Sequence, residues 1–290
     1  MSPNKARRNA VVAIIAATAL CMLSACATAP HAFSSDPLAI MGGDASWYAV
    51  VPVSGNKVLL EELAHNMDNP QSVKNVLNRT NRIYLSGTLL QDESSGLLPF
   101  KILATGSYPK SMASIAFSSS RGWEKQGAVF GSVWFKNGYF GAAIPRKGLV
   151  CMSDSALMPG MLENVQKPFL EPIAVDPLFR ASVEQPDTDS QITVFISEAS
   201  YFLQLILGSN ITFAAQNILI TASPDAGSKG EDYRVGVRIT LADQRNARAL
   251  ATLFRIVLNV PIHIENNTLI VNEQKMTAKE LAHKFYFLYL

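Results

Sequence analysis

The sequence lacks the short motifs that identify most hydrolases, nucleotide-binding enzymes and zinc proteases. The nucleophile elbow Gly-x-Ser-x-Gly is absent, and so are the phosphate-binding loop, the dinucleotide-binding glycine pattern and His-Glu-x-x-His. Only four histidines occur in the 290 residues. We therefore predict no catalytic residue, no metal site and no cofactor.

Two pairs of titratable side chains come nearest to a reactive site. Glu61 and His65 are four residues apart on a predicted helix, and His263 and Glu265 are two apart on a predicted strand, so each pair shares a face. Acid–base catalysis needs a cleft, and a metal site needs a third ligand. A solvent-exposed helix face and a solvent-facing hairpin therefore account for the two pairs.

Apolar runs long enough to cross a bilayer as a helix, which takes about 20 residues, are also missing. The longest run, Ala10 to Leu23, follows the cationic residues Lys5, Arg7 and Arg8 and ends in Leu23-Ser24-Ala25-Cys26. This order of a positive start, an apolar core and small residues is typical of an export signal. Cleavage as an ordinary secretory signal near Ala25-Cys26-Ala27, and retention as a helix, are the alternatives.

The four residues Leu23-Ser24-Ala25-Cys26 resemble the lipobox of bacterial lipoproteins, the substrates of signal peptidase II. The resemblance implies cleavage before Cys26, a diacylglycerol thioether on its sulfur and an acyl chain on the new amino group. Two or more chains anchor a protein stably in a membrane. Ala27 stands where an aspartate resembles the inner-membrane retention signal, which favours outer-membrane delivery.

These patterns predict a protein of the cell envelope that is lipid-anchored in the outer membrane and faces the periplasm or the cell surface. Residues 1–25 are the predicted signal peptide. Residues 26–44 are predicted to be the lipidated cysteine and a flexible tether, because proline, glycine and small polar residues dominate them.

The sequence also has no large excess of basic or of acidic residues. The chain has 25 basic and 23 acidic residues, and removal of Lys5, Arg7 and Arg8 leaves 22 against 23. Such a balance excludes the basic footprint of a nucleic-acid-binding protein. Loss of Cys21 and acylation of Cys26 leave Cys151, so a disulfide framework is excluded. Cys151 lies in an apolar, strand-like run, which favours a buried core thiol over a nucleophile.

The mature region contains strand-like and helix-like segments that follow one another in a similar order twice. In the second half, apolar residues alternate from Tyr233 to Leu241, and Asp243 is expected to cap a helix over 244–258. In the first half, a strand over 98–106 leads to a helix over 109–119. A hairpin with Asn137-Gly138 or Asn266-Asn267 at its tip follows in each half.

We therefore predict an α+β fold of two related repeats, residues 45–167 and 190–290, each a mostly antiparallel β-sheet with helices packed on one face. Residues 168–189, with four prolines, are the predicted linker or a long surface crossover. The sequence motifs of the mature region name no family.

Three groups of side chains are candidates for interaction, and each has an ordinary structural alternative. Leu97 and Leu98 form an exposed tip or begin the next strand. A stripe of arginines contacts an anionic partner or only keeps a helix soluble; its members are Arg245, Arg248 and Arg255. Phe285 and Phe287, in an apolar C-terminal run, mark an interface, or that run packs into the core.

The predicted function is a membrane-anchored, non-enzymatic binding or assembly module with a protein partner in the cell envelope. The alternative is a carrier of lipid or another hydrophobic ligand, which needs an apolar cavity of more than about 300 Å³. A hydrolytic enzyme is less favoured and needs a cleft that gathers titratable groups such as Glu61 and His65. The sequence leaves the oligomeric state open.

Overall fold

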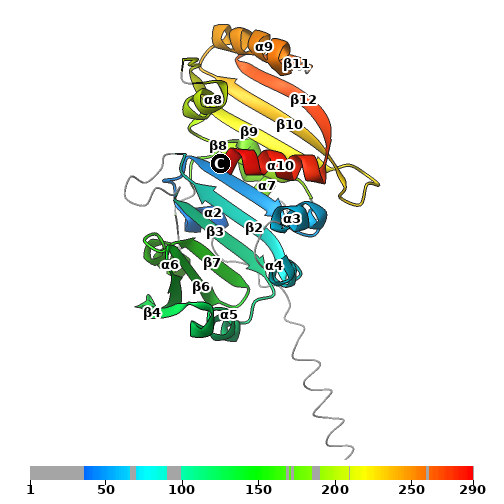
Figure 1. Cartoon of the computed structure of the whole chain (residues 1–290). Helices are drawn as coiled ribbons and strands as arrows, with labels where there is room; N and C mark the ends of the chain where they lie inside the picture. Colours follow the sequence, from blue (N-terminus) through cyan, green and yellow to red (C-terminus); the bar gives the residue numbers. More distant parts are fainter. Residues whose placement is uncertain are drawn as a thin grey trace, which may run out of the picture. The chain divides into compact units, whose positions relative to one another are not determined.

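The computed structural model describes residues 36–65, 70–89, 99–167, 170, 173–184, 190–208, 210–258 and 261–289. The predicted signal peptide and Cys26 lie outside these ranges. The described chain is built on one antiparallel sheet of 12 strands in the order β11-β12-β10-β9-β8-β1-β2-β3-β7-β6-β5-β4 (Figure 1). The predicted class, helices with antiparallel sheet, is confirmed.

The first half supplies seven strands and most of the helices. Its strands are β1 (Trp47–Pro52), β2 (Thr80–Gly87), β3 (Phe100–Gly106), β4 (Glu124–Val129), β5 (Ser132–Asn137), β6 (Phe140–Arg146) and β7 (Leu149–Asp154). Its helical segments are α2 (Pro37–Met41), α3 (Lys57–Ala64), α4 (Pro70–Leu77), the 3₁₀ turn η1 (Lys110–Met112), α5 (Ala113–Ala116), the 3₁₀ turn η2 (Ser119–Arg121), α6 (Met158–Gln166) and α7 (Pro177–Glu184).

The second half supplies five strands and three helices. Its elements are β8 (Ile192–Ile196), α8 (Ala199–Leu207), β9 (Ala215–Pro224), β10 (Asp232–Leu241), α9 (Gln244–Leu258), β11 (Ile262–Glu265), β12 (Thr268–Thr277) and α10 (Ala278–Tyr289). Asp243 caps α9 as expected, because its Oδ1 accepts a hydrogen bond of 2.8 Å from the Asn246 amide.

The two halves share a strand order but differ in size. Reading outward from the centre, the first half runs β1-β2-β3-β7-β6 and the second runs β8-β9-β10-β12-β11, and the first half then adds β5 and β4. The turn that matches Asn266-Asn267 is therefore Lys147-Gly148, between β6 and β7. The expectation that Asn137-Gly138 occupies the equivalent tip is wrong, because it joins the added strand β5 to β6.

A continuous ladder joins the halves at the centre of the sheet. Strands β1 and β8 pair antiparallel, with Trp47 opposite Ile196 and Ala49 opposite Val194. The largest core cluster crosses this seam, since Phe195 of β8 packs with Tyr48 of β1 and Phe179 of α7. The halves are therefore parts of one packed body.

Two segments expected to be connectors contribute to that core. Residues 37–41, assigned by sequence to the flexible tether, form α2, in which Leu38, Ile40 and Met41 are fully buried. Residues 177–184, inside the predicted linker, form α7, whose Phe179 is fully buried. Both boundaries are corrected, because short amphipathic segments next to prolines carry too little periodicity to be recognised.

Helices α8, α9 and α10 cover one face of the second half, and helices cover both faces of the first half. Helices α8 and α9 pack over Ile218 and Ile239, and α10 packs beside α3 over Ala222 and Tyr233. In the first half, α2, α6 and α7 cover the face of Tyr84, Leu103 and Cys151, whereas α5 covers the opposite face over Ala104 and Ile144. On the opposite face of the second half, Phe195 of β8 and Leu219 of β9 join the core cluster of α7, so the expected single layer of helices is broken there. In the first half, β3 and β7 bury apolar side chains on both faces.

Candidate functional site

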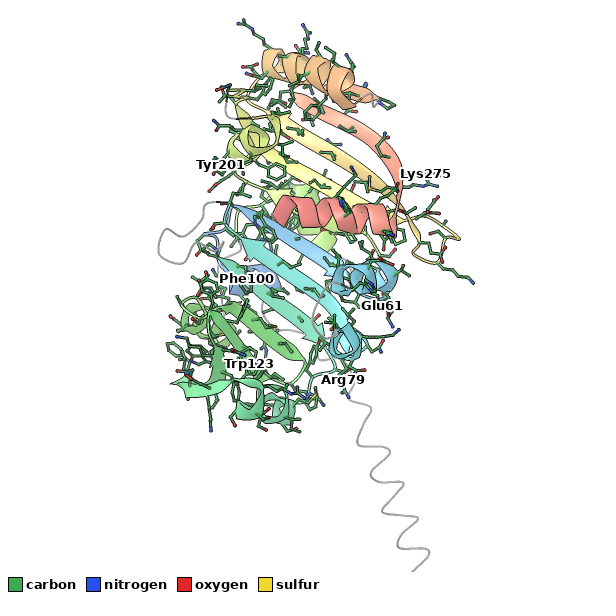
Figure 2. All side chains as sticks on the ribbon, viewed as in Figure 1. Glu61, Arg79, Phe100, Trp123, Tyr201 and Lys275 are labelled. Atoms are coloured by element: carbon green, nitrogen blue, oxygen red, sulfur yellow. The ribbon has the colours of Figure 1, made fainter. Side chains whose placement is uncertain are left out.

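A solvent-open groove of about 450 Å³ lies at the outer end of the first half, between the α5 segment and strands β4, β5 and β6. Aromatic and aliphatic side chains form its floor: Phe117, Trp123, Val133, Phe135 and Ile144. Small and cationic side chains form its rim: Lys110, Ala113, Ser114, Ser118, Ser119 and Lys125. Figure 2 labels Trp123 at this end of the sheet.

The groove exists because the predicted helix over 109–119 forms only in part. The 3₁₀ turn η1 runs directly into α5, so the chain is helical over 110–116, and the separate turn η2 follows over 119–121. Ser118, Ser119 and Ser120 favour local hydrogen bonds over helix propagation, and the Ser118 hydroxyl lies 2.9 Å from that of Ser120. Gly122 then ends η2 with a φ of 79°, a conformation that glycine adopts readily. The chain therefore folds back over the sheet and brings Phe117 to Trp123.

On the floor of the groove, the Phe117 ring contacts two other aromatic rings. The centroid of the Phe117 ring lies 4.9 Å from that of Trp123 and 5.5 Å from that of Phe135, with tilted planes. Phe135 is only 7% exposed, whereas Phe117 and Trp123 are half-buried. The inner ring is therefore part of the core, and the outer two rings offer apolar surface to solvent.

The same part of the chain has a net positive charge, whereas the rest of the predicted mature sequence has a net negative charge. Six bases lie between residues 104 and 150, against the single acid Glu124; they are Lys110, Arg121, Lys125, Lys136, Arg146 and Lys147. The rest of the predicted mature sequence then has 16 basic and 22 acidic residues. Within the described chain, no ion pair involves Lys110 or Lys125. The rim of the groove is thus cationic and uncompensated.

A second open hollow, of about 420 Å³, lies between α6 and the residues that follow α2. Lys101 Nζ donates to Asp44 Oδ1 at 2.8 Å and to the Met41 carbonyl at 2.7 Å. Burial works to raise the pKa of the Asp44 carboxyl, but the hydrogen bond and the charge of Lys101 outweigh it and lower that pKa. The charges of this hollow therefore satisfy each other.

The arginine stripe lies on the solvent face of α9, as its periodicity predicts. Arg245, Arg248 and Arg255 are exposed, and Arg255 Nη2 donates to the Ile262 carbonyl at 2.9 Å. Ile256, next to Arg255, is 77% exposed. On α8, Leu205 and Ile206 are each more than half exposed. Helices α8 and α9 thus present apolar side chains that the sequence analysis had not singled out.

The remaining predicted interaction residues cannot be placed by their side chains. Leu97, Leu98 and Cys26 lie outside the described residues. Phe285 and Phe287 belong to α10, but the description of that helix covers side chains only as far as Lys284. The interaction roles of Leu97, Leu98, Phe285 and Phe287 and the lipidation of Cys26 remain predictions.

The titratable pairs noted in the sequence lie on the surface. Glu61 pairs with Lys74, with 3.4 Å between Oε1 and Nζ, and His65 is exposed. His263 Nε2 lies 3.7 Å from Glu265 Oε1, and both side chains are more than half exposed. Cys151 is fully buried, and burial raises the pKa of its thiol to about 12. The structure brings none of these groups into the groove.

Sequence reasoning missed the groove because its residues come from several separate elements, namely η1, α5, η2, β4, β5 and β6, and from the residues that connect them. Two signals were available. One was the excess of bases between residues 104 and 150, and the other was the run of three serines inside a predicted helix.

In the described ranges, no helix is long and apolar enough to cross a membrane.

Comparison with known proteins assigns a family. Residues 33–282 match the family model described as "Outer membrane-associated lipoprotein TP0453". The curated "Outer membrane protein TP0453" of Treponema pallidum (strain Nichols) is 24% identical over 261 residues, which cover 88% of this chain and 86% of that protein. The predicted lipoprotein nature and outer-membrane association agree with these descriptions.

Solved structures of TP0453 have the same fold. Crystal form I superposes with a TM-score of 0.72 at 21% identity and covers 88% of this chain and 99% of that one. Crystal form III gives a TM-score of 0.70 at 21% identity, with 86% and 96% covered. Because the family match spans most of the sequence, the chain belongs to the family of outer membrane-associated lipoproteins described by TP0453.

Proposed function

We propose that this lipoprotein is a non-enzymatic binding module, held at the membrane by acylated Cys26, that engages its partner through the groove of the first half. The single observation that carries the proposal is the pair of partly exposed rings, Phe117 and Trp123, beside two lysines that have no ion pair in the described chain. Aromatic side chains in such positions supply a large share of binding energy at protein interfaces.

The polar groups that line the groove favour binding over catalysis. The Ser114 hydroxyl donates to the Ser111 carbonyl at 3.3 Å, and the Ser118 and Ser120 hydroxyls bond to each other. Among the described residues that line the groove there is no histidine or carboxylate to activate a hydroxyl. These hydroxyls can orient a ligand, and no imidazole or carboxylate of the described lining stands beside them.

A role as a lipid carrier has less support. Both hollows described above are open to solvent, so an acyl chain placed in either one would keep part of its apolar surface in water. Contact with a lipid surface is the second candidate. The observation in its favour is Ile256 on α9, exposed beside Arg255, since exposed apolar groups next to cations suit an anionic membrane interface.

A photo-crosslinking experiment separates these candidates. A photoreactive amino acid replaces Ser119 in the groove, Thr252 on α9 or Ala226 in the β9–β10 loop, each in the acylated protein in the producing bacterium. We expect a protein adduct of defined mass from position 119, and we expect Trp123→Ala to abolish it.

The control at Ala226 reports non-specific contact. Lipid adducts from position 252 alone would favour the second candidate. Equal adducts from all three positions, or none from position 119, would contradict the groove as the binding site.

A further inference from the structure

We infer that the groove takes an extended acidic peptide segment of a partner protein, which adds as a strand to the free edge of β4 and lays an apolar side chain on Phe117 and Trp123. This inference rests on the proposed function and names its partner class. Three features of the first half support it: a strand edge, a cationic rim and an aromatic floor on the same face.

The strand edge speaks for a peptide rather than a glycan or a lipid. Strand β4 ends the sheet and pairs only with β5 among the described strands. At Gly127 of β4, an added side chain would meet no atom within 4 Å, so a neighbouring backbone can approach closely. The outward amide and carbonyl groups of an edge strand are satisfied by another extended backbone, the recognition mode of strand addition.

The charges select an acidic segment and disfavour a second copy of this chain. Lys125 of β4 lies opposite Phe135 in the ladder, so it points to the groove face of the sheet together with the aromatic floor. Edge-to-edge pairing of two copies would bring two basic ends together, and lysines on edge strands disfavour such self-pairing. An acidic strand at the same edge would instead be attracted by the lysines.

The aromatic floor sets the pattern of that segment. Side chains at alternate positions of a strand point to the same face, about 7 Å apart. One apolar side chain can therefore rest on Phe117 and Trp123, while acidic side chains two positions away approach Lys110 and Lys125. Two further apolar side chains are exposed in this part of the chain: Ile115 of α5 is 71% exposed, and Phe130 at the β4–β5 turn is 61% exposed.

Titration of the full mature lipoprotein in detergent micelles tests the inference. The probe is a labelled eight-residue peptide of Glu, Leu and Thr with Leu and Glu at alternate positions of one face, and binding is followed by fluorescence anisotropy. We expect Lys110→Gln combined with Lys125→Gln to weaken binding about tenfold. Trp123→Ala should weaken it about 30-fold.

Two matched controls separate the contribution of the lysine charges to the binding affinity from that of the backbone hydrogen bonds. Lys136→Gln changes a neighbouring lysine on the opposite face of β5 and should leave the affinity unchanged. A peptide of the same sequence with N-methyl groups at alternate amides cannot pair with β4, and it should lose about tenfold or more in affinity. The N-methylated peptide requires no change in the protein. It therefore tests strand addition to β4 even if the Trp123→Ala variant fails to fold.

Each other result overturns the inference in a recognisable way. If a peptide with Lys in place of Glu binds as tightly as the original peptide, the ligand is not selected for acidic side chains. If the N-methylated peptide binds as tightly as the original, the peptide does not add to β4 as a strand. Either result contradicts the inference. Lysine-dependent binding of oligoglucuronate or of phosphatidylglycerol vesicles, without binding of the acidic peptide, replaces the partner class and leaves the binding-module function standing. Failure of every probe together with no adduct from position 119 removes both proposals.

Discussion

The rings of Phe117 and Trp123 lie with centroids 4.9 Å apart and planes inclined by 58°. Only five residues separate them, and those residues include η2 and the left-handed Gly122. A continuous helix would have carried Phe117 along its axis, whereas the broken segment turns it toward the sheet. The resulting platform combines a buried ring, Phe135, with two rings left half-open to solvent.

Phe135 and Trp123 should differ in their contributions to stability. We expect Phe135→Ala to lower the free energy of unfolding by about 3–5 kcal/mol, because it empties a buried site. We expect Trp123→Ala to lower it by about 1 kcal/mol, since mainly a ring contact is lost. Urea denaturation measures both. Equal losses would make Trp123 an ordinary core residue and weaken its assignment to binding.

The two halves should unfold together, because β1 and β8 form a continuous ladder and Phe195 packs across the seam. Leu250→Ala, in the buried face of α9, should cost about 2–5 kcal/mol. It should also speed labelling of the Cys151 thiol, which lies in the first half. Arg248→Gln, on the exposed face of α9, serves as the control. If Leu250→Ala leaves Cys151 labelling unchanged, the halves unfold independently.

Burial of Cys151 should make stability depend on alkaline pH. Burial raises the pKa of its thiol from 9.0 to about 12, so the folded state retains a proton that the unfolded state loses. The stabilisation is complete below pH 9 and declines as the pH rises toward 12, by at most about 1.4 kcal/mol per pH unit. Cys151→Ala should show a shallower decline between about pH 9 and pH 11. Identical slopes for the two proteins would disprove the shift.

Replacement of the predicted lipidated residue should separate anchoring from folding. Cys26→Ala is expected to leave the melting temperature unchanged, since the packed elements begin at α2, after residue 36. The variant should move from the detergent phase to the aqueous phase in a detergent-partitioning experiment, because it carries no acyl chain. Retention in the detergent phase would refute the lipid anchor.

The second half could be read from sequence almost element by element. The alternating segment from Tyr233 to Leu241 and the helix predicted over 244–258 coincide with β10 and α9. Each has one apolar and one polar face, so its period is visible in the residues themselves. The buried thiol of Cys151 and the solvent face of Arg245 and Arg248 follow from the same local pattern.

The first half was harder because its strands are covered on both sides. In β3, Leu103, Ala104 and Thr105 are all buried, so alternation no longer marks a face. The helix expected over 109–119 had apolar spacing in its favour, but the serines and Gly122 decided the local conformation.

The pairing of β1 with β8 and the burial of α2 and α7, in the predicted tether and linker, could not be predicted from the residues of any one segment. Pairing of β1 with β8 joins residues more than 140 positions apart, and α7 reaches the core through Phe179 only because Tyr48 and Phe195 meet there. The groove likewise brings together side chains from η1, α5, η2 and strands β4, β5 and β6. The pattern of apolar and polar residues in a segment indicates which of its faces is buried. It does not indicate which distant segment covers that face, because this depends on how all segments pack into one core.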